Sequence, residues 1–446
     1  MSQKDSTDEV VKDWFGQLPE GWSLRRLRTL GRFSSSGIDK KTVEGEPLVR
    51  MVNYTDVYGN STHELRNSPD YMVVSCPANK VEEHGLVQGD MLLTPSSETP
   101  EDIGVSAVVM EDLDNTVYSY HITRFRMRDE VSLRYRKYLC NHPRVLRQFS
   151  RLCKGTTRQI LVREDFKSAW VAVPPPDQHD RIAAYLDAAT GKIDRLMSLR
   201  RRQMDLLREQ RAALIQQAVT RGLNPRAPLK DSGLPWLGQI PTHWTITQVK
   251  RGAVIISKGS TPSTIGSEFV ESGVRFLKAE NILNGTVLSE PSFFVDEATH
   301  NSMRRSHLQP NDLLVVIAGA TTGKAGVLPA ELTPANANQA VCFVRFRDAQ
   351  VSSFCNEWLA LAPVRDLMLQ KAVQSAQPNL AMPDLGAVPI VKIPREERAE
   401  ILTLVGRIKA QSSKIIASYE RQLALLAEYR ASLIHECVTG QRPVPN

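Results

Sequence analysis

The sequence predicts an α+β protein in which two β-rich domains occur in tandem and each is followed by one long helix. Three observations predict this fold. Short apolar runs lie between turn residues in two separate regions of the chain. A long stretch with helical periodicity follows each region. The two halves also share motifs in the same order, which indicates an internal duplication.

Length and composition narrow the class of protein. A chain of 446 residues is expected to hold two to four domains. No apolar run is long enough to cross a membrane, and the polar start lacks the apolar segment of a secretion signal, so we expect a cytoplasmic protein. The six cysteines show no zinc spacing. The formal charge of +7 mildly favours a polyanionic partner.

The first long helix is expected over Gln178–Thr220 and the second over Arg395–Thr439. Neither stretch contains proline, and apolar residues recur at three- and four-residue steps in both. Such a rod spans about 65 Å, longer than a helix of a compact domain, so the two helices are expected to pack on each other. The residues predicted to pair them are Ile182, Leu186, Ile193, Leu196, Leu207, Leu214, Ile401, Leu404, Ile408, Ile415, Leu426 and Leu433.

The duplication rests on matched motifs. Trp14–Pro19 matches Trp236–Pro241, and Gln88–Leu92 matches Pro310–Leu314 at the same separation. The motif Arg126–Asp129 matches Arg345–Asp348 at a separation three residues shorter, as do the ends of the two long helices. One deletion in the second copy explains both separations, and chance matches would not share a register over this distance.

Within each copy, strands and helices follow from the apolar pattern. The predicted strands are Leu48–Val52, Tyr71–Ser75, Met91–Thr94, Val105–Met110 and Ile122–Met127, then Val274–Leu277, Asp312–Ala318 and Ala340–Phe346. One helix is expected after each set, near Arg134–Leu152 and Ser353–Val373. The predicted segments are a first domain at 1–176, a helix at 177–222, a linker at 223–235, a second domain at 236–394, a helix at 395–440 and a tail at 441–446.

Several of these motifs together resemble a known family. They are Trp236–Trp244 (WLGQIPTHW), the turn Lys258–Pro262, Phe276–Ile282, Pro174–Pro176 leading into Gln178–Arg181, and the paired helix ends RAALIQQAVTRG and RASLIHECVTG. In this order and in duplicate, they resemble the specificity subunit of Type I restriction-modification systems. The resemblance covers about residues 14–440.

The resemblance implies a function. Each β-rich region would be a target recognition domain that reads one half of a bipartite, asymmetric duplex DNA site. The helices would form an antiparallel coiled coil that sets the spacer and docks two modification (methyltransferase) subunits, with two restriction (translocase and nuclease) subunits joining them. The chain would be non-catalytic and hold no cofactor, whereas S-adenosylmethionine, ATP and Mg²⁺ would bind the partner subunits in a bacterial or archaeal cytoplasm.

Candidate DNA contacts are polar side chains on loops near strand ends, because base reading needs hydrogen-bonding groups at a groove and cations fix the phosphates. Four of them, His121, Arg124, Asn338 and Gln339, are expected on a strand or just before it. In the first half the candidates are Ser35, Ser36, Asn53, Tyr54, Ser96, Ser97, His121, Arg124, Arg158 and Gln159. In the second half they are Lys258, Ser260, Thr261, Lys278, Asn281, Thr321, Thr322, Lys324, Asn338, Gln339 and Asn379. The alternative for each is a solvated loop residue or a turn cap. The triple Arg200–Arg202 is either a phosphate contact or a solvated helix face.

One place departs from the pattern. The first copy has Ser34–Ile38 where the second has Lys258–Pro262, so the sequence leaves the alignment of the first recognition loop open.

Two other functions compete with DNA recognition. A self-contained restriction-methylation enzyme would need catalytic motifs, but the glycine-rich stretch Gly319–Ala325 lacks the spacing and the hydroxyl of a phosphate loop. The Asn/Asp-Pro-Pro-aromatic sequence of adenine methylation is also absent. A purely structural coiled-coil scaffold would not need two large duplicated globular regions.

Overall fold

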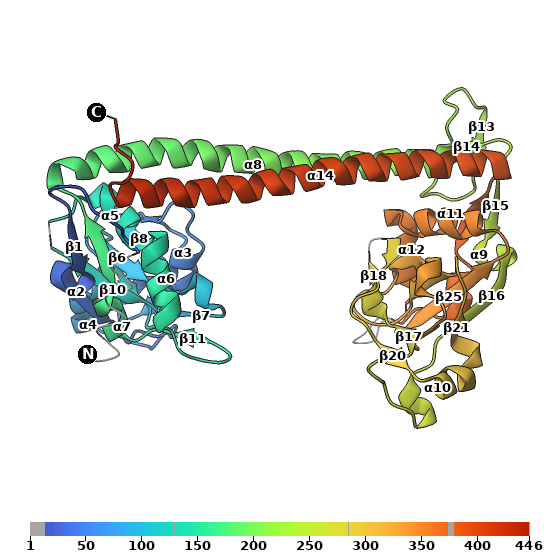
Figure 1. Cartoon of the computed structure of the whole chain (residues 1–446), viewed down its shortest axis with the longest axis horizontal. Coiled ribbons are helices and arrows are strands. Elements are labelled where there is room, and N and C mark those ends of the chain that lie inside the picture. The colour runs from blue at the N-terminus through green and yellow to red at the C-terminus, as the bar shows by residue number, and fades with distance from the viewer. Residues whose placement is uncertain (1–13, 129, 284, 373–378, 446) are drawn as a thin grey trace. The chain divides into compact units, whose positions relative to one another are not determined.

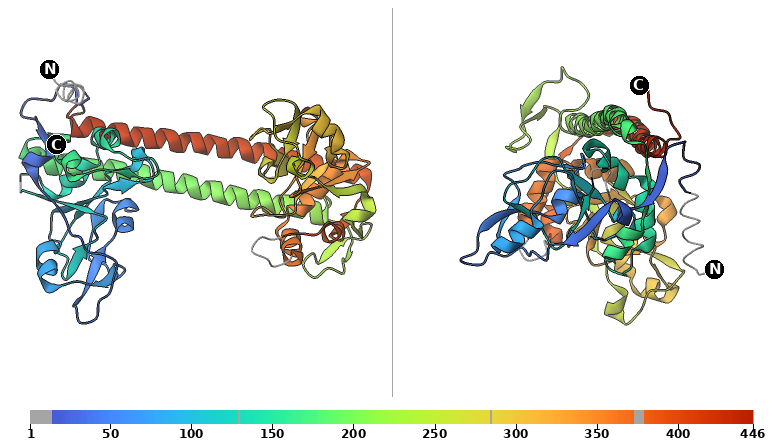
Figure 2. Two further views of the ribbon diagram at one scale, coloured as in Figure 1. Left: turned by 90° about the horizontal axis from the view of Figure 1, so that it is seen from below. Right: turned by 90° about the vertical axis from the view of Figure 1, so that its left-hand side faces the viewer.

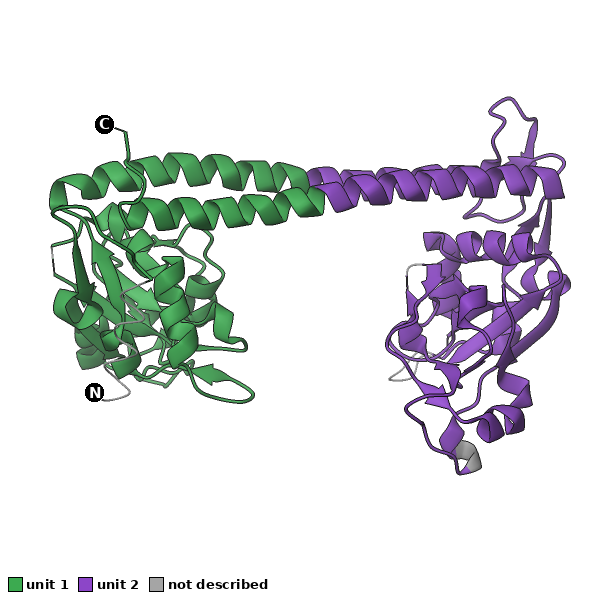
Figure 3. Ribbon diagram, viewed as in Figure 1, with its two compact units in different colours: residues 1–201, 419–446 green, residues 202–418 purple. Residues whose placement is uncertain are grey.

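The structure is a computed structural model that describes residues 14–128, 130–283, 285–372 and 379–445. The chain divides into two compact units. Unit 1 is formed by residues 1–201 and 419–446, and unit 2 by residues 202–418 (Figure 3). Each unit therefore combines one β-rich region with a part of each long helix. None of the helices among the described residues is long and apolar enough to cross a membrane.

Unit 1 is built on a five-stranded sheet in the order β2-β10-β6-β8-β4. Neighbouring strands are antiparallel except β4 and β8, which are parallel. The strands are β2 (Gly31–Ser35), β10 (Thr123–Met127), β6 (Asp90–Leu93), β8 (Ser106–Val109) and β4 (Glu64–Leu65). The predicted strands near 91–94, 105–110 and 122–127 correspond to β6, β8 and β10, with bounds that differ by one or two residues.

Smaller sheets and short helices complete unit 1. A three-stranded sheet has the order β5-β3-β9, and two strand pairs are β1-β12 and β7-β11. The strands are β5 (Met72–Ser75), β3 (Leu48–Val52), β9 (Thr116–Tyr118), β1 (Ser23–Arg26), β12 (Trp170–Val173), β7 (Ser96–Ser97) and β11 (Gln159–Ile160). The helices are α2 (Leu27–Leu30), α3 (Tyr54–Tyr58), α4 (Ala78–His84), η1 (Pro100–Asp102), α5 (Leu133–Cys140), α6 (Pro143–Leu152) and α7 (Arg163–Ser168).

Unit 2 is built on a six-stranded sheet in the order β16-β25-β22-β23-β19-β18. Its strands are β16 (Ala253–Lys258), β25 (Val341–Phe346), β22 (Leu313–Val316), β23 (Ala325–Val327), β19 (Gly285–Val287) and β18 (Ile282–Leu283). A four-stranded sheet is formed by β20 (Phe294–Val295), β17 (Val274–Leu277), β24 (Ala335–Ala337) and β21 (His307–Leu308), and a strand pair by β15 (Thr245–Gln248) and β26 (Pro389–Lys392).

The helices of unit 2 connect these strands. They are α9 (Val249–Gly252), η2 (Pro262–Ile265), η3 (Ala279–Asn281), α10 (Glu297–Ser302), η4 (Arg304–Ser306), η5 (Ala330–Leu332), α11 (Ala349–Leu359), α12 (Ala362–Lys371) and α13 (Met382–Gly386).

The same strand pairings recur in the two units. The run β2-β10-β6-β8-β4 has its counterpart in β16-β25-β22-β23-β19, and in both runs the last pair is parallel. An ion pair between a buried aspartate and an arginine also recurs. Asp90 Oδ1 lies 2.7 Å from Arg126 Nε, and Asp312 Oδ1 lies 2.8 Å from Arg345 Nε. Two of the motifs that the sequence repeats are therefore joined to each other in each unit.

Two expectations about these regions need correction. Each predicted single helix is divided in two, as α5 and α6 and as α11 and α12. Pro143 and Pro363 lie in the first turns of α6 and α12. Proline has no N–H to donate within a helix, so each preceding helix ends before its proline and a new helix begins there. The predicted end Val373 lies outside the described residues. In addition, the predicted linker contains β13 (Leu229–Asp231), which pairs with β14 (Gln239–Pro241).

The long helices are α8 (Pro176–Arg221) and α14 (Arg395–Val438), close to the predicted bounds. In unit 1 the start of α8 packs on the end of α14, where Ile182, Leu186 and Ile193 share a core with Leu433 (Figures 1 and 2). Arg430 Nε also contacts Asp194 Oδ1 at 3.0 Å.

In unit 2 the end of α8 and the start of α14 belong to one core, which contains Ile215, Val219 and Ile401. Ile408 packs against that core, and Leu426 packs against the core of unit 1. Leu207 is half-buried. Other residues predicted to pair the helices are exposed instead: Leu196, Leu214, Leu404 and Ile415. A straight helix has 3.6 residues per turn, so positions repeated every seven residues drift away from the buried face along a long helix. Ile215 is therefore buried in place of the predicted Leu214.

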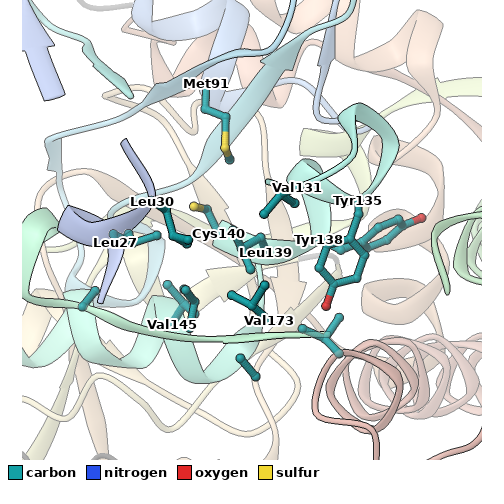
Figure 4. Packing of buried hydrophobic residues seen from close by; sticks show 14 of the residues in the cluster. Leu27, Leu30, Met91, Val131, Tyr135, Tyr138, Leu139, Cys140, Val145 and Val173 are labelled. Carbon is teal, nitrogen blue, oxygen red and sulfur yellow. The ribbon is translucent and has the colours of Figure 1, made fainter. Parts of the chain in front are cut away.

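The largest core of unit 1 lies between the main sheet, α5, α6 and the two long helices (Figure 4). Tyr135 and Leu139 on α5 are fully buried there, as are Leu27 and Leu30 on α2. This packing joins the β-rich region of unit 1 to parts of both long helices.

Candidate nucleic-acid interface

Three strand ends of unit 1 meet at one edge. The Ser36 hydroxyl donates a hydrogen bond to the Tyr118 carbonyl at 2.6 Å, which ties the end of β2 to the end of β9. The Ser119 N–H donates to the Val52 carbonyl at 3.0 Å, which ties β9 to the end of β3. The structure therefore brings together loops that the sequence analysis selected separately, including those with Ser35, Asn53 and His121.

Tyr54 is the centre of a polar cluster at this edge. It is half-buried, and its ring stacks on Tyr58 with centroids 5.3 Å apart. Burial raises the pKa of Tyr54, whereas a hydrogen bond with Ser97 and the nearby charge of Arg158 lower it. Ser97 and Arg158 come together because β7 pairs with β11, with Ser97 opposite Gln159. The buried Ser97 hydroxyl thus holds the phenol of Tyr54 beside the exposed guanidinium of Arg158, and these two groups can act on one ligand.

His121 stands beside this cluster. Its ring lies 3.8 Å from the ring of Tyr120. Burial lowers the pKa of His121, and the positive charges of Arg158 and Lys40 lower it further, against the charge of Asp39. The imidazole is therefore neutral at neutral pH, with one donor and one acceptor nitrogen.

The corresponding edge of unit 2 brings together the equivalent strand ends, here through backbone bonds. Lys258 is exposed at the end of β16, opposite Cys342. The Ser260 N–H donates to the Ala337 carbonyl at 3.0 Å, and the Asn338 N–H donates to the Leu277 carbonyl at 2.9 Å. Glycine is required at position 259, between Lys258 and Ser260, since a Cβ there would lie 1.9 Å from the Ala337 carbonyl oxygen.

Lys278 is held in place at this edge by aromatic rings. Its Nζ lies 3.3 Å from the ring centroid of Phe293 and 4.6 Å from that of Phe269. Such contacts favour a fixed cation over a freely rotating one. The backbone N–H of Lys278 donates to Asn281 Oδ1 at 2.9 Å, as the N–H of Asn53 donates to Asp56 Oδ2 at 2.7 Å in unit 1. Asn53 and Lys278 are therefore equivalent positions.

The sheet register also settles the open alignment of the first recognition loop. Ser35 pairs with Thr123 in unit 1, and Lys258 pairs with Cys342 in unit 2. These two pairs correspond, so Ser35 is the counterpart of Lys258. An irregularity between Ala253 and Ile255 inserts one residue into β16. This bulge shifts the two sequences by one position, which explains why motif matching alone could not align them.

Polar atoms without a partner occur at the two edges. Among the described residues, Asn53 Oδ1 and Ser119 Oγ in unit 1 and Asn338 Oδ1 in unit 2 are buried without a hydrogen bond. Ser119 and Asn338 are equivalent, since their N–H groups bond Val52 and Leu277 at corresponding strand ends. Unsatisfied polar atoms are rare in proteins and call for an explanation such as a ligand or a bound water.

Other predicted contacts are internal. Arg124 is buried and donates to the Ser34 hydroxyl and to the carbonyls of Gly85 and Glu83. Asn281 is fully buried by its bonds to Lys278, Leu288 and Pro291, and the Thr322 hydroxyl donates to the Gly319 carbonyl. Ser36, Asn53, Ser96 and Ser97 are also largely buried. A short polar residue after a strand often caps a turn, and sequence alone does not distinguish this role from a base contact.

The remaining predicted contacts lie on loops of the two units or, for Gln159 and Lys258, on strands. Arg158, Lys258, Gln339 and Asn379 are exposed, and Gln159, Ser260, Thr261, Lys278, Thr321, Lys324 and Asn338 are half-buried. Asn379 bridges to Ala318, which follows β22. In the triple Arg200–Arg202, the guanidinium of Arg200 lies 5.1 Å from the Tyr419 ring, so it faces α14. The sequence analysis missed Tyr58, Tyr120 and Phe269, which are exposed aromatic residues of these edges.

Two specificity subunits of Type I restriction enzymes are similar to this chain in sequence. The chain is 23% identical over 297 residues to the specificity subunit of the Type I restriction enzyme MjaVIII from Methanocaldococcus jannaschii, covering 66% of this chain and 67% of that one. It is 22% identical over 300 residues to the EcoBI specificity subunit from Escherichia coli, covering 64% and 61%. The chain resembles Type I specificity subunits.

Solved structures agree with the sequence relatives. The HsdS subunit from Thermoanaerobacter tengcongensis is 16% identical, with a TM-score of 0.51 over 96% of this chain and 98% of that one. A chain from a structural study of the assembly and conformational transition of the type I R-M system is also 16% identical, with a TM-score of 0.72 over 96% and 100%. No protein-family model matches the chain. The predicted resemblance to specificity subunits is confirmed, and the fold is the mixed α and β fold of these structures.

Proposed function

We propose that this chain is the non-catalytic DNA-recognition subunit of a Type I restriction-modification complex, in which each unit reads one half of a bipartite duplex site. The observation that carries the proposal is the recurrence of one loop edge in both units: the N–H groups of Ser119 and Asn338 make equivalent backbone bonds, while the side chains around them differ. A repeated backbone framework that carries different side chains suits a protein that recognises DNA sequence. Each base pair presents its own pattern of donors and acceptors, and side chains with the complementary pattern select it.

The two edges present different chemistry. Unit 1 offers the neutral imidazole of His121, the phenol of Tyr54 and the guanidinium of Arg158. Unit 2 offers the amines of Lys258 and Lys278 beside the amides of Asn338 and Gln339. Different donor and acceptor sets select different bases, so we infer that the two half-sites differ and that the whole site is asymmetric.

In this proposal α8 and α14 form an antiparallel coiled coil along their length that sets the spacer between half-sites. Support comes from exposed apolar residues that the repeat places twice: Leu196 on α8 matches Ile415 on α14, and Leu206 matches Leu425. Exposed apolar positions repeated in this way suit two copies of one partner. We infer that two modification subunits dock there, with two restriction subunits joining them, and that S-adenosylmethionine, ATP and Mg²⁺ bind those partners.

A binding experiment tests the proposal. The methylated motif is first mapped in a strain that carries the chain with its modification subunit. The affinity of the complex for duplexes with the intact motif, with either half scrambled and with both halves scrambled is then measured. Scrambling each half should weaken binding by about 1–3 kcal/mol per mismatched base pair. Equal affinity for all four duplexes would contradict sequence recognition.

Variants of the two edges sharpen this test. Lys258→Gln with Lys278→Gln should reduce the dependence of log affinity on log salt by about 2, because each lysine that contacts a phosphate contributes about one unit. The purified chain alone should transfer no methyl group and cleave no DNA. Turnover by the isolated chain would instead favour a self-contained enzyme, and failure to bind any DNA with its partners would favour a scaffold.

A further inference from the structure

Helix α6 of unit 1 carries a row of cations on its solvent face. The exposed cations are Arg147 and Arg151 on the helix and Lys154, which follows it by two residues. Val145 and Phe149 on the opposite face of the helix are buried. Arg147 and Arg151 are one helical turn apart, about 6 Å along the axis. Among the described residues, neither arginine forms an ion pair with a carboxylate. The row therefore has charge available for a ligand.

An indole holds two of these cations. The Arg147 guanidinium carbon lies 4.8 Å from the Trp14 ring centroid, and that of Arg151 lies 5.1 Å away. Stacking on one ring fixes both guanidinium groups, so less side-chain entropy is lost when they bind an anion.

The row leads towards the candidate interface of unit 1. Lys154 pairs with Ile160, and β11, which contains Ile160, pairs with β7 at Ser96 and Ser97 (Figure 1). Helix η1 packs against α6, and its Asp102 acts on the pKa of Tyr54. One end of the row thus adjoins the cluster of Tyr54, Ser97 and Arg158.

Unit 2 lacks this device in the equivalent helix. Helices α6 and α12 have the same length, and Val145 and Phe149 correspond to the buried Val364 and Met368. In that alignment Asp366 and Gln370 hold the places of Arg147 and Arg151, and both are exposed.

The tryptophan of unit 2 that is equivalent to Trp14 has a different packing partner. Trp236, the counterpart of Trp14, packs edge-on against Trp358 with centroids 5.8 Å apart. Leu139 stands at the position of Trp358 in unit 1, which leaves the Trp14 ring free for the two arginines.

We propose that the row formed by Arg147, Arg151 and Lys154 binds the DNA phosphate backbone beside the half-site read by unit 1, and that unit 2 has no such extension. The proposal rests on the proposed function and adds an asymmetry to it. Duplex DNA carries one phosphate per strand for about every 3.4 Å of axis, so a row of this spacing can meet two or three consecutive phosphates. Contacts of this kind fix the register of a protein on DNA without reading sequence.

A pair of matched variants tests the proposal in the complex with the modification subunit. R147Q/R151Q removes two cations of the row, and R365Q/K371Q removes two exposed cations from α12 and changes the net charge equally. R147Q/R151Q should lower the slope of log affinity against log salt by about 2, with the control changing it by less than about 0.5. The methylated motif should be the same for both variants and the wild type.

Truncated duplexes locate the contact. Removing base pairs one at a time from the side of the motif read by unit 1 should weaken wild-type binding, and R147Q/R151Q should be insensitive to that truncation. D366R/Q370R should create a similar sensitivity on the side read by unit 2. An unchanged thermal unfolding curve shows that a variant is folded.

Several results would overturn the proposal. Equal salt slopes for the two matched variants would exclude a phosphate contact. Loss of the modification subunit from the R147Q/R151Q complex, with DNA binding by the remaining complex unchanged, would assign the row to a protein partner. If the wild type fails to discriminate the motif from scrambled DNA but the slope still falls, the row binds DNA and the proposed function fails instead.

Discussion

Units 1 and 2 share a frame and differ in the side chains placed on it. The strand order, the Asp–Arg pair with its buried aspartate and the capped strand ends recur. The loop residues do not, because Ser35 corresponds to Lys258 and Asn53 to Lys278. The comparison teaches that the sheet and its ion pair, which support the strand ends, are common to both units. The units differ in the polar and charged groups that the strand ends and loops present.

The recurring ion pair should produce the largest effect when it is broken. Arg345 is 18% exposed and Arg126 is 45% exposed, while both aspartates are buried. Asp312→Ala leaves a largely buried cation without its carboxylate and should destabilise unit 2 by about 3–5 kcal/mol. Asp90→Ala should cost unit 1 less, because Arg126 can reach water. Urea unfolding monitored within each unit measures both values, and a larger cost for Asp90→Ala would contradict this ranking.

The next largest effect concerns the long helices. Ile215 is 9% exposed and the adjacent Leu214 is 43% exposed. Ile215→Ala should therefore destabilise unit 2 by about 2–3 kcal/mol, whereas Leu214→Ala should cost less than about 1 kcal/mol. Thermal unfolding of the two variants compares them directly. Equal losses would mean that Leu214 belongs to the buried face after all.

A third effect distinguishes the units by pH. His142 Nε2 lies 3.0 Å from His435 Nδ1 in unit 1, and Leu361 holds the place of His142 in unit 2. Burial, together with the smaller effects of the charges of His435 and Arg144, lowers the pKa of His142 from 6.5 to about 3. Burial and Arg144 also lower the pKa of His435, against the charge of Glu436.

Because the folded pKa of His142 is below the unfolded one, the unfolded chain takes up its proton first. The contribution of His142 is therefore complete above about pH 6.5 and is lost as the pH falls towards 3. Unit 1 should lose about 2 kcal/mol between pH 7 and pH 5 from this residue. His142→Leu should reduce that loss, and stability that is equally pH-dependent in the variant would show that other groups are responsible.

The smallest effect on stability is expected at the repeated exposed leucines. Leu206 is 54% exposed and Leu425 is 64% exposed, so changing either to serine should alter the unfolding free energy by less than about 0.5 kcal/mol. The same changes should reduce co-purification of the modification subunit, with the double variant losing more than either single variant. Full retention of the partner by the double variant would remove these residues from the docking surface.

The frame could be predicted from the sequence to a large extent, and the site only in part. Periodicity located α8 and α14 within two residues, because a long amphipathic pattern has few alternatives. Leu48–Val52 and Val274–Leu277 were placed at their observed bounds. The burial of Arg124 and Asn281 was not foreseen, because a polar residue near a strand end gives the same signal whether it bonds a carbonyl or faces solvent. The bulge in β16 also has no signature in a single sequence.

The most direct test of the central claim is an exchange of residues 236–394 for the equivalent region of a relative that methylates a different motif. Methylated adenines are then mapped across the genome of a strain that carries the hybrid chain. If each unit reads one half-site, one half of the motif should change and the other half should stay the same. A hybrid that changes both halves, or neither half while remaining active, would contradict the account.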